Sequence, residues 1–468
     1  MATEQTTIIP HTQKPYVTRA YPTPDQVDAA IIAAAEAQEK WKLVPLADRK
    51  AICSRFLEEM KKNADVIAKE LTIQMGRPLS QTPGELRGFL ERGNHLVSVA
   101  EDALKDVPLK DTDKPGFRRY IRRVPFGVAF VVVPWNYPYL TTINSLLPAL
   151  LAGNSVILKP SPQTPLTAER MAEALKRAGL PDNVLQVLHL SPELVKHACR
   201  HPKVTYISFT GSVAVGRDID QTAASTGDFK TVGLELGGKD PAYVRADANL
   251  DYTVGELVDG ALFNSGQSCC AVERIYVHES IFDQFTAKFV EMVKSYKLGD
   301  PTEDGVNLGP VVSVASAERI KKQVADAVSA GAKALIPEDA FPIAKAPGTA
   351  YVAPQVLVNV DHSMDVVMEE TFGPIAPILK VSGDEEAVKL MNDSKYGLTA
   401  SVWTTNENAF EALVDKIEAG TVFQNRCDYL DPALAWTGLK HSGRGISLSK
   451  YGFDQVTRAK SVHIKTAP

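Results

Sequence analysis

A cysteine and a glutamate near the middle of the chain are the first residues that suggest chemistry. Cys269 follows Gly266 at the end of a short polar segment, where a turn between a helix and a strand is expected. A thiolate attacks carbonyl carbons readily, so Cys269 is a candidate nucleophile. For a single cysteine a buried structural thiol is the commoner role, and the neighbouring Cys270 adds no support.

Glu235 is the candidate general base. It ends a predicted strand, and Gly237 and Gly238 after it allow a tight turn and a close backbone approach to a ligand. A carboxylate at the carboxyl end of a strand points into the crevice where α/β proteins bind ligands, and it can activate water. The alternative, of about equal weight for this residue alone, is a loop acid paired with Lys239.

Two further segments offer hydrogen-bond donors. Asn136 lies between Pro134 and Pro138, and a rigidly held amide suits an oxyanion donor, although an Asx turn is the favoured alternative in isolation. Gly211 and Ser212 form a turn between a predicted strand and helix, where a pyrophosphate could bind at the helix N-terminus. The full dinucleotide fingerprint is missing, so this signal is weak alone.

The elements that position these residues change in type along the chain. The first quarter is predicted to be helical, with helices from a capping box at Thr23 to Trp41, over 46–75 and over 82–104. Strands then alternate with helices; those expected are 120–124, 128–133, 155–159, 184–190 and 204–209. A second alternating block begins near Pro241; it holds helices at 252–263 and 281–296 and strands at 274–277, 378–381 and 401–404. This rhythm predicts an α/β protein with two doubly wound, mostly parallel sheets.

Composition narrows the function classes. With 468 residues, 44% apolar and 23% charged, the chain is globular and too long for one core. A net charge of −5 without a basic stretch argues against nucleic acid. The five cysteines suggest neither a disulfide framework nor a zinc site, so no metal is expected. No signal peptide is apparent, and the most apolar stretch, 137–158, is interrupted by polar residues, so we expect no membrane association and a cytoplasmic location.

Taken together, four segments resemble the aldehyde dehydrogenase superfamily. They are Pro134–Pro138, Glu235–Lys239, Phe263–Cys269 and Glu369–Pro374, in this order, and the resemblance covers nearly the whole chain. The glutamate and cysteine segments are highly specific in combination, which outweighs the structural alternatives for each residue alone. The resemblance implies NAD(P)-dependent oxidation of an aldehyde. Relatives that acylate coenzyme A generally lack the glutamate, so a free carboxylic acid is the implied product.

The resemblance also implies roles by position. Cys269 would form a thiohemiacetal and then a thioester, Asn136 with the backbone N–H of Cys269 would hold the oxyanion, and Glu235 would activate the hydrolytic water. Lys159 would contact the adenosine ribose and Glu370 the nicotinamide ribose. The full set implied at the cofactor is Trp135, Lys159, Ser161, Gly211, Ser212, Glu370 and Phe372.

The cofactor and the substrate pocket follow from the same resemblance. Pro162 stands where NAD-preferring relatives often carry an acid, so the cofactor is NAD or NADP, with NADP tolerated and its preference left open. The implied pocket residues are Tyr137, Leu140, Asn144, Ser268, Cys270, Asp428, Leu430 and Trp436. Relatives acting on succinic semialdehyde usually carry a cation near Asn144. None is visible there, although Arg426 could substitute, so an aliphatic or aromatic aldehyde is favoured over a semialdehyde or an aminoaldehyde held by Asp428.

The implied architecture has three parts: a Rossmann-like dinucleotide-binding domain of residues 1–106 and 126–235, a catalytic domain of 236–441, and an oligomerisation element of 107–125 and 455–468 in a homodimer or homotetramer. Two other classes remain as alternatives. A cofactor-independent cysteine esterase would need only Cys269 and Glu235, but would leave Lys159, Glu370 and the Gly211 turn without a role. A silent structural protein on the same fold would have no need to retain both catalytic residues.

Overall fold

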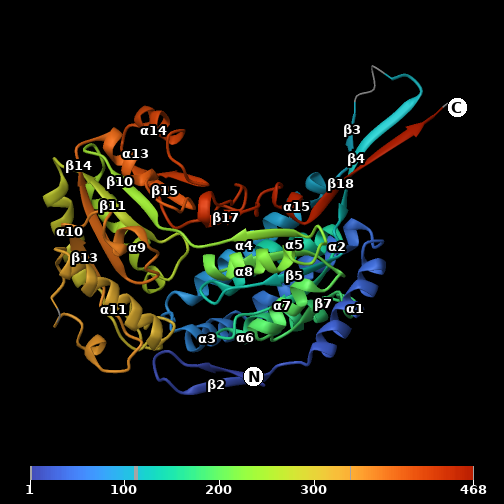
Figure 1. Cartoon of the computed structure of the whole chain (residues 1–468), viewed down its shortest axis with the longest axis horizontal. Coiled ribbons are helices and arrows are strands. Elements are labelled where there is room, and N and C mark those ends of the chain that lie inside the picture. Colours follow the sequence, from blue (N-terminus) through green and yellow to red (C-terminus); the bar gives the residue numbers. More distant parts are fainter. Residues whose placement is uncertain (1–2, 110–113, 338, 467–468) are drawn as a thin grey trace.

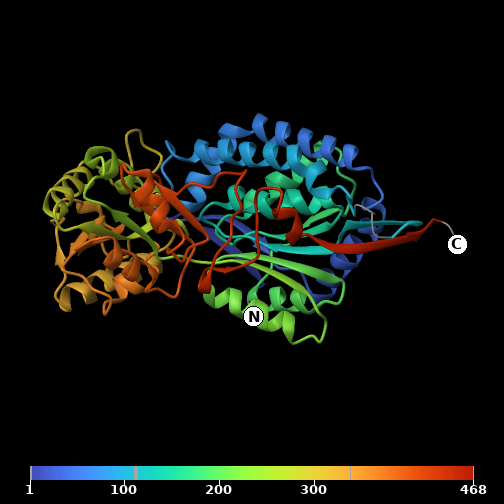
Figure 2. The same cartoon turned by 90° about the horizontal axis from the view of Figure 1, so that it is seen from above.

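Two helix-covered sheets lie side by side along the long axis of the molecule, and a strand arm leaves the body at one end (Figures 1 and 2). The computed structural model describes residues 3–109, 114–337 and 339–466. One sheet has six strands in the order β17-β9-β8-β5-β6-β7, and the other has seven in the order β12-β13-β14-β11-β10-β15-β16. The predicted α/β class with mostly parallel sheets is confirmed. The predicted domain limits stay a prediction, and their parts at 1–2, 110–113, 338 and 467–468 lie outside the described residues.

The six-stranded sheet is built from short apolar runs joined by helices. Its parallel strands are β5 (Val128–Val132), β6 (Ser155–Lys159), β7 (Leu185–Val187), β8 (Val204–Thr210) and β9 (Thr231–Glu235). Strands β5 and β6 are buried throughout, as expected when helices cover both faces of a parallel sheet. The covering helices are α5 (Pro138–Ala152), α6 (Pro165–Arg177), α7 (Pro192–Arg200) and α8 (Val213–Ala224). A late segment, β17 (Gly443–Arg444), pairs antiparallel with β9, so the C-terminal part of the chain returns to the end of the Glu235 strand.

The N-terminal helices pack on this sheet, and one of the predicted helices is in fact two. The helices are α1 (Pro24–Trp41), α2 (Leu46–Lys62), α3 (Ala64–Met75) and α4 (Thr82–Leu104). The capping box at Thr23 is present. The single helix expected over 46–75 is broken at Asn63, which has non-helical dihedral angles and donates its side-chain amide to the Glu59 carbonyl at 3.0 Å.

A hairpin of β1 (Glu4–Ile8) and β2 (Pro15–Ala20) precedes these helices, where the sequence analysis expected no strand. Its inward-facing residues, Gln5 and Thr7, are polar, so the apolar alternation that marks a strand is absent. The hydroxyl of Thr7 donates to the Pro162 carbonyl at 2.8 Å, which ties the hairpin to the loop after β6.

The seven-stranded sheet follows β9 directly. Its parallel strands are β10 (Asp240–Val244), β11 (Val272–His278), β13 (Gln355–Val358), β14 (Ile375–Val381), β15 (Thr399–Trp403) and β16 (Thr421–Gln424), with β12 (Lys333–Ala334) antiparallel at one edge. The helices are α9 (Leu250–Leu262), α10 (Phe282–Lys294), α11 (Val314–Ser329), α12 (Asp365–Met368), α13 (Asp384–Asn392) and α14 (Glu407–Val414), and α15 (Gly452–Gln455) lies near the C-terminus. The loop with Cys269 enters β11 and the segment with Glu370 enters β14, so both lie at the amino ends of strands of this sheet.

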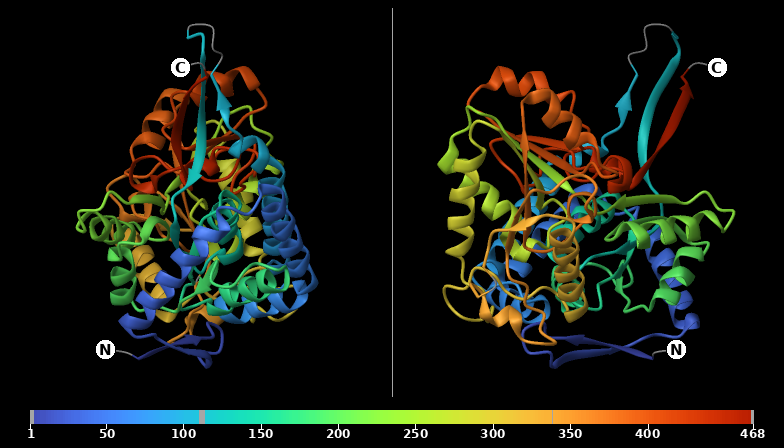
Figure 3. Two further views of the ribbon diagram at one scale, coloured as in Figure 1. Left: turned by 90° about the vertical axis from the view of Figure 1, so that its right-hand side faces the viewer. Right: turned by 60° about the vertical axis from the view of Figure 1, so that its left-hand side comes forward.

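The arm consists of β3 (Val107–Pro108), β4 (Phe117–Pro125) and β18 (Thr457–Lys465), and it projects clear of the body (Figure 3). Strands β4 and β18 pair antiparallel over their whole length and are largely exposed. Within the three described ranges, no helix is long and apolar enough to cross a membrane. The same residues contain no group of three or more potential metal ligands.

Candidate active site

Cys269 lies where two cavities meet, between the two large sheets. It lines a cavity of about 330 Å³ together with the predicted residues Trp135, Asn136, Gly211, Ser212, Glu235, Glu370 and Phe372. It also lines a second cavity of about 420 Å³, bordered by α4, α5 and the segment after β16. A nucleophile shared by two cavities can react with a molecule in one while a second molecule occupies the other.

The loop that carries Cys269 has an unusual backbone. Asn264, Ser265 and Gly266 all have left-handed dihedral angles, with φ of 53°, 56° and 71°, which turns the chain sharply between α9 and β11. A side chain at Gly266 would collide with the Gly373 carbonyl, so only glycine fits there. Buried hydrogen bonds hold the strained turn: Ser265 donates to the Gly309 carbonyl at 2.9 Å, and Asn264 accepts from Arg77 at 3.1 Å.

Asn136 is fixed against the same loop. Its side-chain amide nitrogen donates to the Gln267 carbonyl at 3.2 Å, and its own carbonyl accepts from Arg77 and Asn264. An amide nitrogen has two hydrogens, so one remains for a second acceptor. The arrangement brings a held donor to the wall of the cavity that Cys269 lines.

Glu235 stands at the end of β9 and forms no ion pair among the described residues, although the positive charge of Arg92 acts on it through space. Its carboxylate accepts from the Ser447 hydroxyl at 2.5 Å and from the Thr210 hydroxyl at 3.4 Å. Burial raises the pKa of Glu235. Lys239 pairs with Glu273 instead, at 2.6 Å, so the ion pair considered as the alternative role of Glu235 is not formed.

The Glu370 side of the first cavity is organised by a buried acid. Glu273 accepts the backbone N–H groups of Thr371 and Phe372 at 2.7 and 2.8 Å, and so holds the segment after α12. Glu370 accepts from the Gly238 N–H at 3.0 Å, and burial raises its pKa to about 7. The Phe372 ring packs edge-on against Trp135, with ring centroids 5.6 Å apart.

Lys159 ends β6, where it pairs with Val132 of β5, and Ser161 follows it; neither residue is among those that line the two cavities. The Lys159 ammonium is buried and has no carboxylate partner among the described residues, and burial lowers its pKa to about 8. Ser212 caps the N-terminus of α8, which faces the first cavity. A buried ammonium without a carboxylate partner and a helix N-terminus each suit a phosphate or ribose group, so Lys159 and Ser212 would fit a dinucleotide cofactor.

The second cavity contains six of the eight predicted substrate residues, namely Tyr137, Leu140, Ser268, Cys270, Asp428 and Leu430. Asp428 accepts from the Ser268 hydroxyl at 2.8 Å and from the Cys270 thiol at 3.0 Å, and burial raises its pKa to about 6. The other two are placed differently. Trp436 packs behind the cysteine loop against Cys270, and Asn144 lies beside Glu235 in a separate small space.

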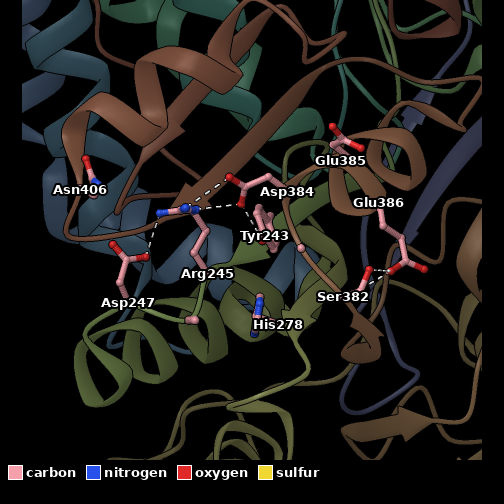
Figure 4. A pocket seen from close by; sticks show the side chains of 11 residues that line it. Tyr243, Arg245, Asp247, His278, Ser382, Asp384, Glu385, Glu386 and Asn406 are labelled. Carbon is pink, nitrogen blue, oxygen red and sulfur yellow. Dashed lines mark hydrogen bonds and ion pairs between the residues drawn. The ribbon is translucent and has the colours of Figure 1, made fainter.

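A further cavity of about 630 Å³ lies at the carboxyl ends of β10, β11 and β14, and it contains none of the predicted site residues (Figure 4). Arg245 bonds to Asp384 at 2.9 Å and to Asp247 at 3.1 Å, and Tyr243 donates to Asp384 at 2.9 Å. These side chains satisfy one another, so we assign no activity to this cavity.

Comparison with known proteins identifies the family. The family model described as "Aldehyde dehydrogenase family" matches residues 2–462. The chain belongs to this family. It is 35% identical over 445 residues to the succinate-semialdehyde dehydrogenase [NADP(+)] of Mycobacterium avium, covering 94% of this chain and 92% of the relative. The Mycobacterium tuberculosis protein named succinate-semialdehyde dehydrogenase [NADP(+)] 1 is 33% identical over 458 residues, covering 98% and 99%.

Solved structures agree with this assignment. An aldehyde dehydrogenase from Brucella melitensis biovar abortus superposes with a TM-score of 0.94 at 31% identity, covering 100% of this chain and 95% of that one. A Staphylococcus aureus betaine aldehyde dehydrogenase in complex with NAD+ superposes with a TM-score of 0.93 at 28% identity, covering 99% and 92%. The predicted family, fold and enzyme class are confirmed, and the expectation of NAD or NADP agrees with the names of these proteins. The roles of individual residues stay predictions.

Three charged residues at the site of this aldehyde dehydrogenase were missed. Arg77, Glu85 and Arg92 all line the second cavity and all are buried. Arg92 donates to the Leu140 carbonyl at 3.0 Å and to the Asn144 side chain at 3.4 Å. The premise that no cation lies near Asn144 is therefore wrong. Arg426, the substitute considered, is exposed and stacks on Tyr429. Glu85 and Arg92 share one face of an amphipathic helix, and charges on an otherwise buried face were the available signal.

Arg77 and Glu85 form a fully buried ion pair of 2.6 Å that also supports the site. Glu85 accepts the first N–H of α5, from Tyr139, at 2.8 Å, while Arg77 holds Asn136 and Asn264. Replacing Glu85 with alanine leaves Arg77 buried without its partner. We expect the free energy of unfolding to fall by about 3–5 kcal/mol, measured by urea denaturation.

The matched control for this prediction is Glu91→Ala, on the exposed face of the same helix. Its effect should stay within about 0.5 kcal/mol. Equal losses in the two variants would mean that the Arg77–Glu85 pair contributes nothing specific.

Proposed function

We propose that this enzyme oxidises an aldehyde to the free carboxylic acid, with NAD or NADP as hydride acceptor, through a thioester on Cys269. The observation that carries the proposal is the position of Cys269 at the junction of two cavities, one of which also holds Glu235. The reaction consumes one aldehyde, one oxidised cofactor and one water. It yields the acid, the reduced cofactor and a proton.

The residues divide the steps between them. The Cys269 thiolate attacks the carbonyl carbon, and the free amide hydrogen of Asn136 with the Cys269 N–H stabilises the resulting oxyanion. The bound cofactor supplies the hydride acceptor, held by Lys159 and Glu370. Glu235 then removes a proton from a water molecule, which attacks the thioester carbon. The C–S bond breaks, the acid leaves and the Cys269 thiolate is regenerated.

The test is absorbance at 340 nm with hexanal, benzaldehyde, succinic semialdehyde and 4-aminobutanal, each with NAD and with NADP. An increase in absorbance with at least one pair is expected. Hydrolysis of p-nitrophenyl acetate without any aldehyde oxidation, and without cofactor binding by calorimetry, would favour the cysteine esterase instead.

Lys159 also bears on the choice of cofactor. The loop after it carries Pro162 in place of an acid and is tied to the N-terminal hairpin through Thr7 and through Gln163, which donates to the Ile8 carbonyl at 2.9 Å. A buried ammonium with no nearby carboxylate favours a 2′-phosphate over a free hydroxyl. We therefore propose that NADP binds at least as tightly as NAD.

Replacing Lys159 with methionine should raise the Kd for NADP by about tenfold or more, and that for NAD by about threefold or less, because the lost charge-assisted bond is made only with the 2′-phosphate. Isothermal titration calorimetry measures both values. Since the pKa of Lys159 is lowered to about 8, the ammonium is present at pH 7 and largely lost at pH 9, so wild-type affinity for NADP should weaken over that interval. Equal losses for both cofactors would contradict the assignment.

We further propose a homodimer or homotetramer in the cytoplasm. The arm of β4 and β18 exposes long paired strands whose edges need covering, which a second copy would provide. All five cysteines are free, which suits a reducing compartment.

A further inference from the structure

Arg92 is a buried cation that forms no ion pair among the described residues. Its side chain is 7% exposed, and only its Nη1 group has protein acceptors, the Leu140 carbonyl and the Asn144 side chain. Neither acceptor is charged. The other guanidinium nitrogens, Nε and Nη2, have no acceptor among the described residues. They are nevertheless accessible to solvent. They therefore face the open space of the cavity that Arg92 lines with Cys269.

The neighbouring acids form no ion pair with Arg92. The charge of Glu235 acts on Arg92 through space, but the Glu235 carboxylate accepts its hydrogen bonds from Ser447 and Thr210. Glu85 is paired with Arg77 at 2.6 Å, and Asp428 accepts from Ser268 and Cys270. Glu91 is exposed and accepts from the Tyr429 hydroxyl at 3.3 Å. Asp259 lies on α9, where burial raises its pKa and so favours the uncharged form. A buried guanidinium left unpaired is costly, and a ligand carboxylate would offset that cost.

We propose that Arg92 binds a carboxylate at the far end of the aldehyde, so that the substrate is a short semialdehyde with an acid terminus. The proposal rests on the aldehyde oxidation proposed above and names its substrate class. A guanidinium binds a carboxylate through two parallel hydrogen bonds, and the unpaired donors of Arg92 are available for this. The cavity holds both Arg92 and Cys269, so one short molecule can reach both residues.

Two observations favour an acid terminus over the neutral and amino alternatives. A neutral chain would leave Arg92 unpaired, and a cationic tail would have to lie in the same cavity as this guanidinium. Asp428, the residue considered for a cationic tail, receives both of its hydrogen bonds on Oδ1, so 4-aminobutanal is included below as the test of that alternative. The Mycobacterium avium relative, 35% identical to this chain, is named for succinate semialdehyde.

The experiment compares succinic semialdehyde with butanal, which has the same four-carbon chain without the carboxylate, and with 4-aminobutanal. Wild-type kcat/KM should be about 100-fold higher for succinic semialdehyde than for either. In Arg92→Gln it should fall about 100-fold for succinic semialdehyde, mainly through KM, and by less than about threefold for butanal. Arg92→Lys keeps the charge but not the bidentate geometry, so its kcat/KM for succinic semialdehyde should lie between those of wild type and Arg92→Gln.

Arg87→Gln is the matched control, because it removes the same charge from an exposed position on the same helix and the same cavity. It should reduce kcat/KM for succinic semialdehyde by less than about threefold. Equal losses for Arg92→Gln with succinic semialdehyde and with butanal would overturn the proposal, since Arg92 would then act on the catalytic residues. A wild-type preference for butanal or 4-aminobutanal would overturn it while leaving aldehyde oxidation intact.

A measurement without turnover separates the two proposals. Succinate should raise the melting temperature of the wild-type enzyme and of Arg87→Gln, and should not raise that of Arg92→Gln, whose fold is checked by its NADP affinity. If no aldehyde is oxidised, the proposed function is wrong. The change in melting temperature with succinate then still tests whether Arg92 binds a carboxylate. The absence of a shift in the wild type would overturn the site, and so would an unchanged shift in Arg92→Gln. If Arg92→Gln does not fold, Arg92→Lys takes its place in both assays.

Discussion

Replacing Cys269 with alanine is expected to abolish aldehyde oxidation, with a loss of about 10⁴-fold or more in kcat/KM. Cys269 and Thr141 each line both the cavity of Glu235 and Glu370 and the cavity of Arg92, and of these two residues only Cys269 carries a thiol. Without its sulfur neither the thiohemiacetal nor the thioester can form. Absorbance at 340 nm measures the rate, and calorimetry with NADP shows that the variant still binds cofactor.

The matched control is Cys270→Ser, one residue further along the same loop. Cys270 is buried and donates to Asp428, and a serine hydroxyl can donate in the same way. A loss of less than about tenfold is expected, because the covalent step does not use this residue. If the Cys269→Ala enzyme keeps more than a few per cent of wild-type activity, the mechanism through a thioester on Cys269 is wrong.

Replacing Glu235 with glutamine should separate the two halves of the reaction. Glutamine keeps the size of the side chain but cannot accept a proton from water, so the thioester forms and is not hydrolysed. We expect a burst of about one reduced cofactor per active site, followed by a steady state about 10³-fold slower than wild type. Stopped-flow absorbance at 340 nm resolves both phases.

The pH dependence gives an independent check on Glu235. Burial raises the pKa of this carboxyl group, so at acidic pH it is protonated and cannot serve as a base. The wild-type steady-state rate should therefore increase with pH through a midpoint above the ordinary glutamate value of about 4.3. This increase should vanish in Glu235→Gln. A slow variant without a burst would place Glu235 before the thioester and contradict the proposed role.

Ser447 is the nearest positioning residue for this base. It donates to Glu235 from a segment 212 residues further along the chain. Nothing in the local pattern around Ser447 marks this contact, because the return of the C-terminal segment to β9 is a tertiary event.

Local pattern in the sequence was sufficient for the main elements, and the family resemblance selected the candidate reactive residues, whose roles stay predictions. The strands of both sheets are short apolar runs, α1 begins at a capping box and α4 has a proline in its first turn, so their approximate places follow from chain-local interactions. Glu235 and Asn136 stand at and just after the carboxyl ends of parallel strands of one sheet, whereas Cys269 lies in the glycine-containing turn before β11 of the other sheet. The hairpin of β1 and β2 and the break at Asn63 were not predicted, because both depend on polar contacts and neither alters the spacing of apolar residues.

The substrate end of the site was decided by the tertiary structure. The guanidinium of Arg92 meets Asn144 only because α4 packs on α5, and the two residues are 52 positions apart in the chain. The same region of the fold brings Arg77 to Asn136, whereas Trp436 packs against Cys270 and pairs with Ser447 of the returning C-terminal segment. The sequence alone determined the fold class, since this depends on local period, and through the family resemblance it predicted the nucleophile and the base. Which charges are buried, and which of them lack a partner, depends on contacts between distant segments, and that is a property of the folded chain.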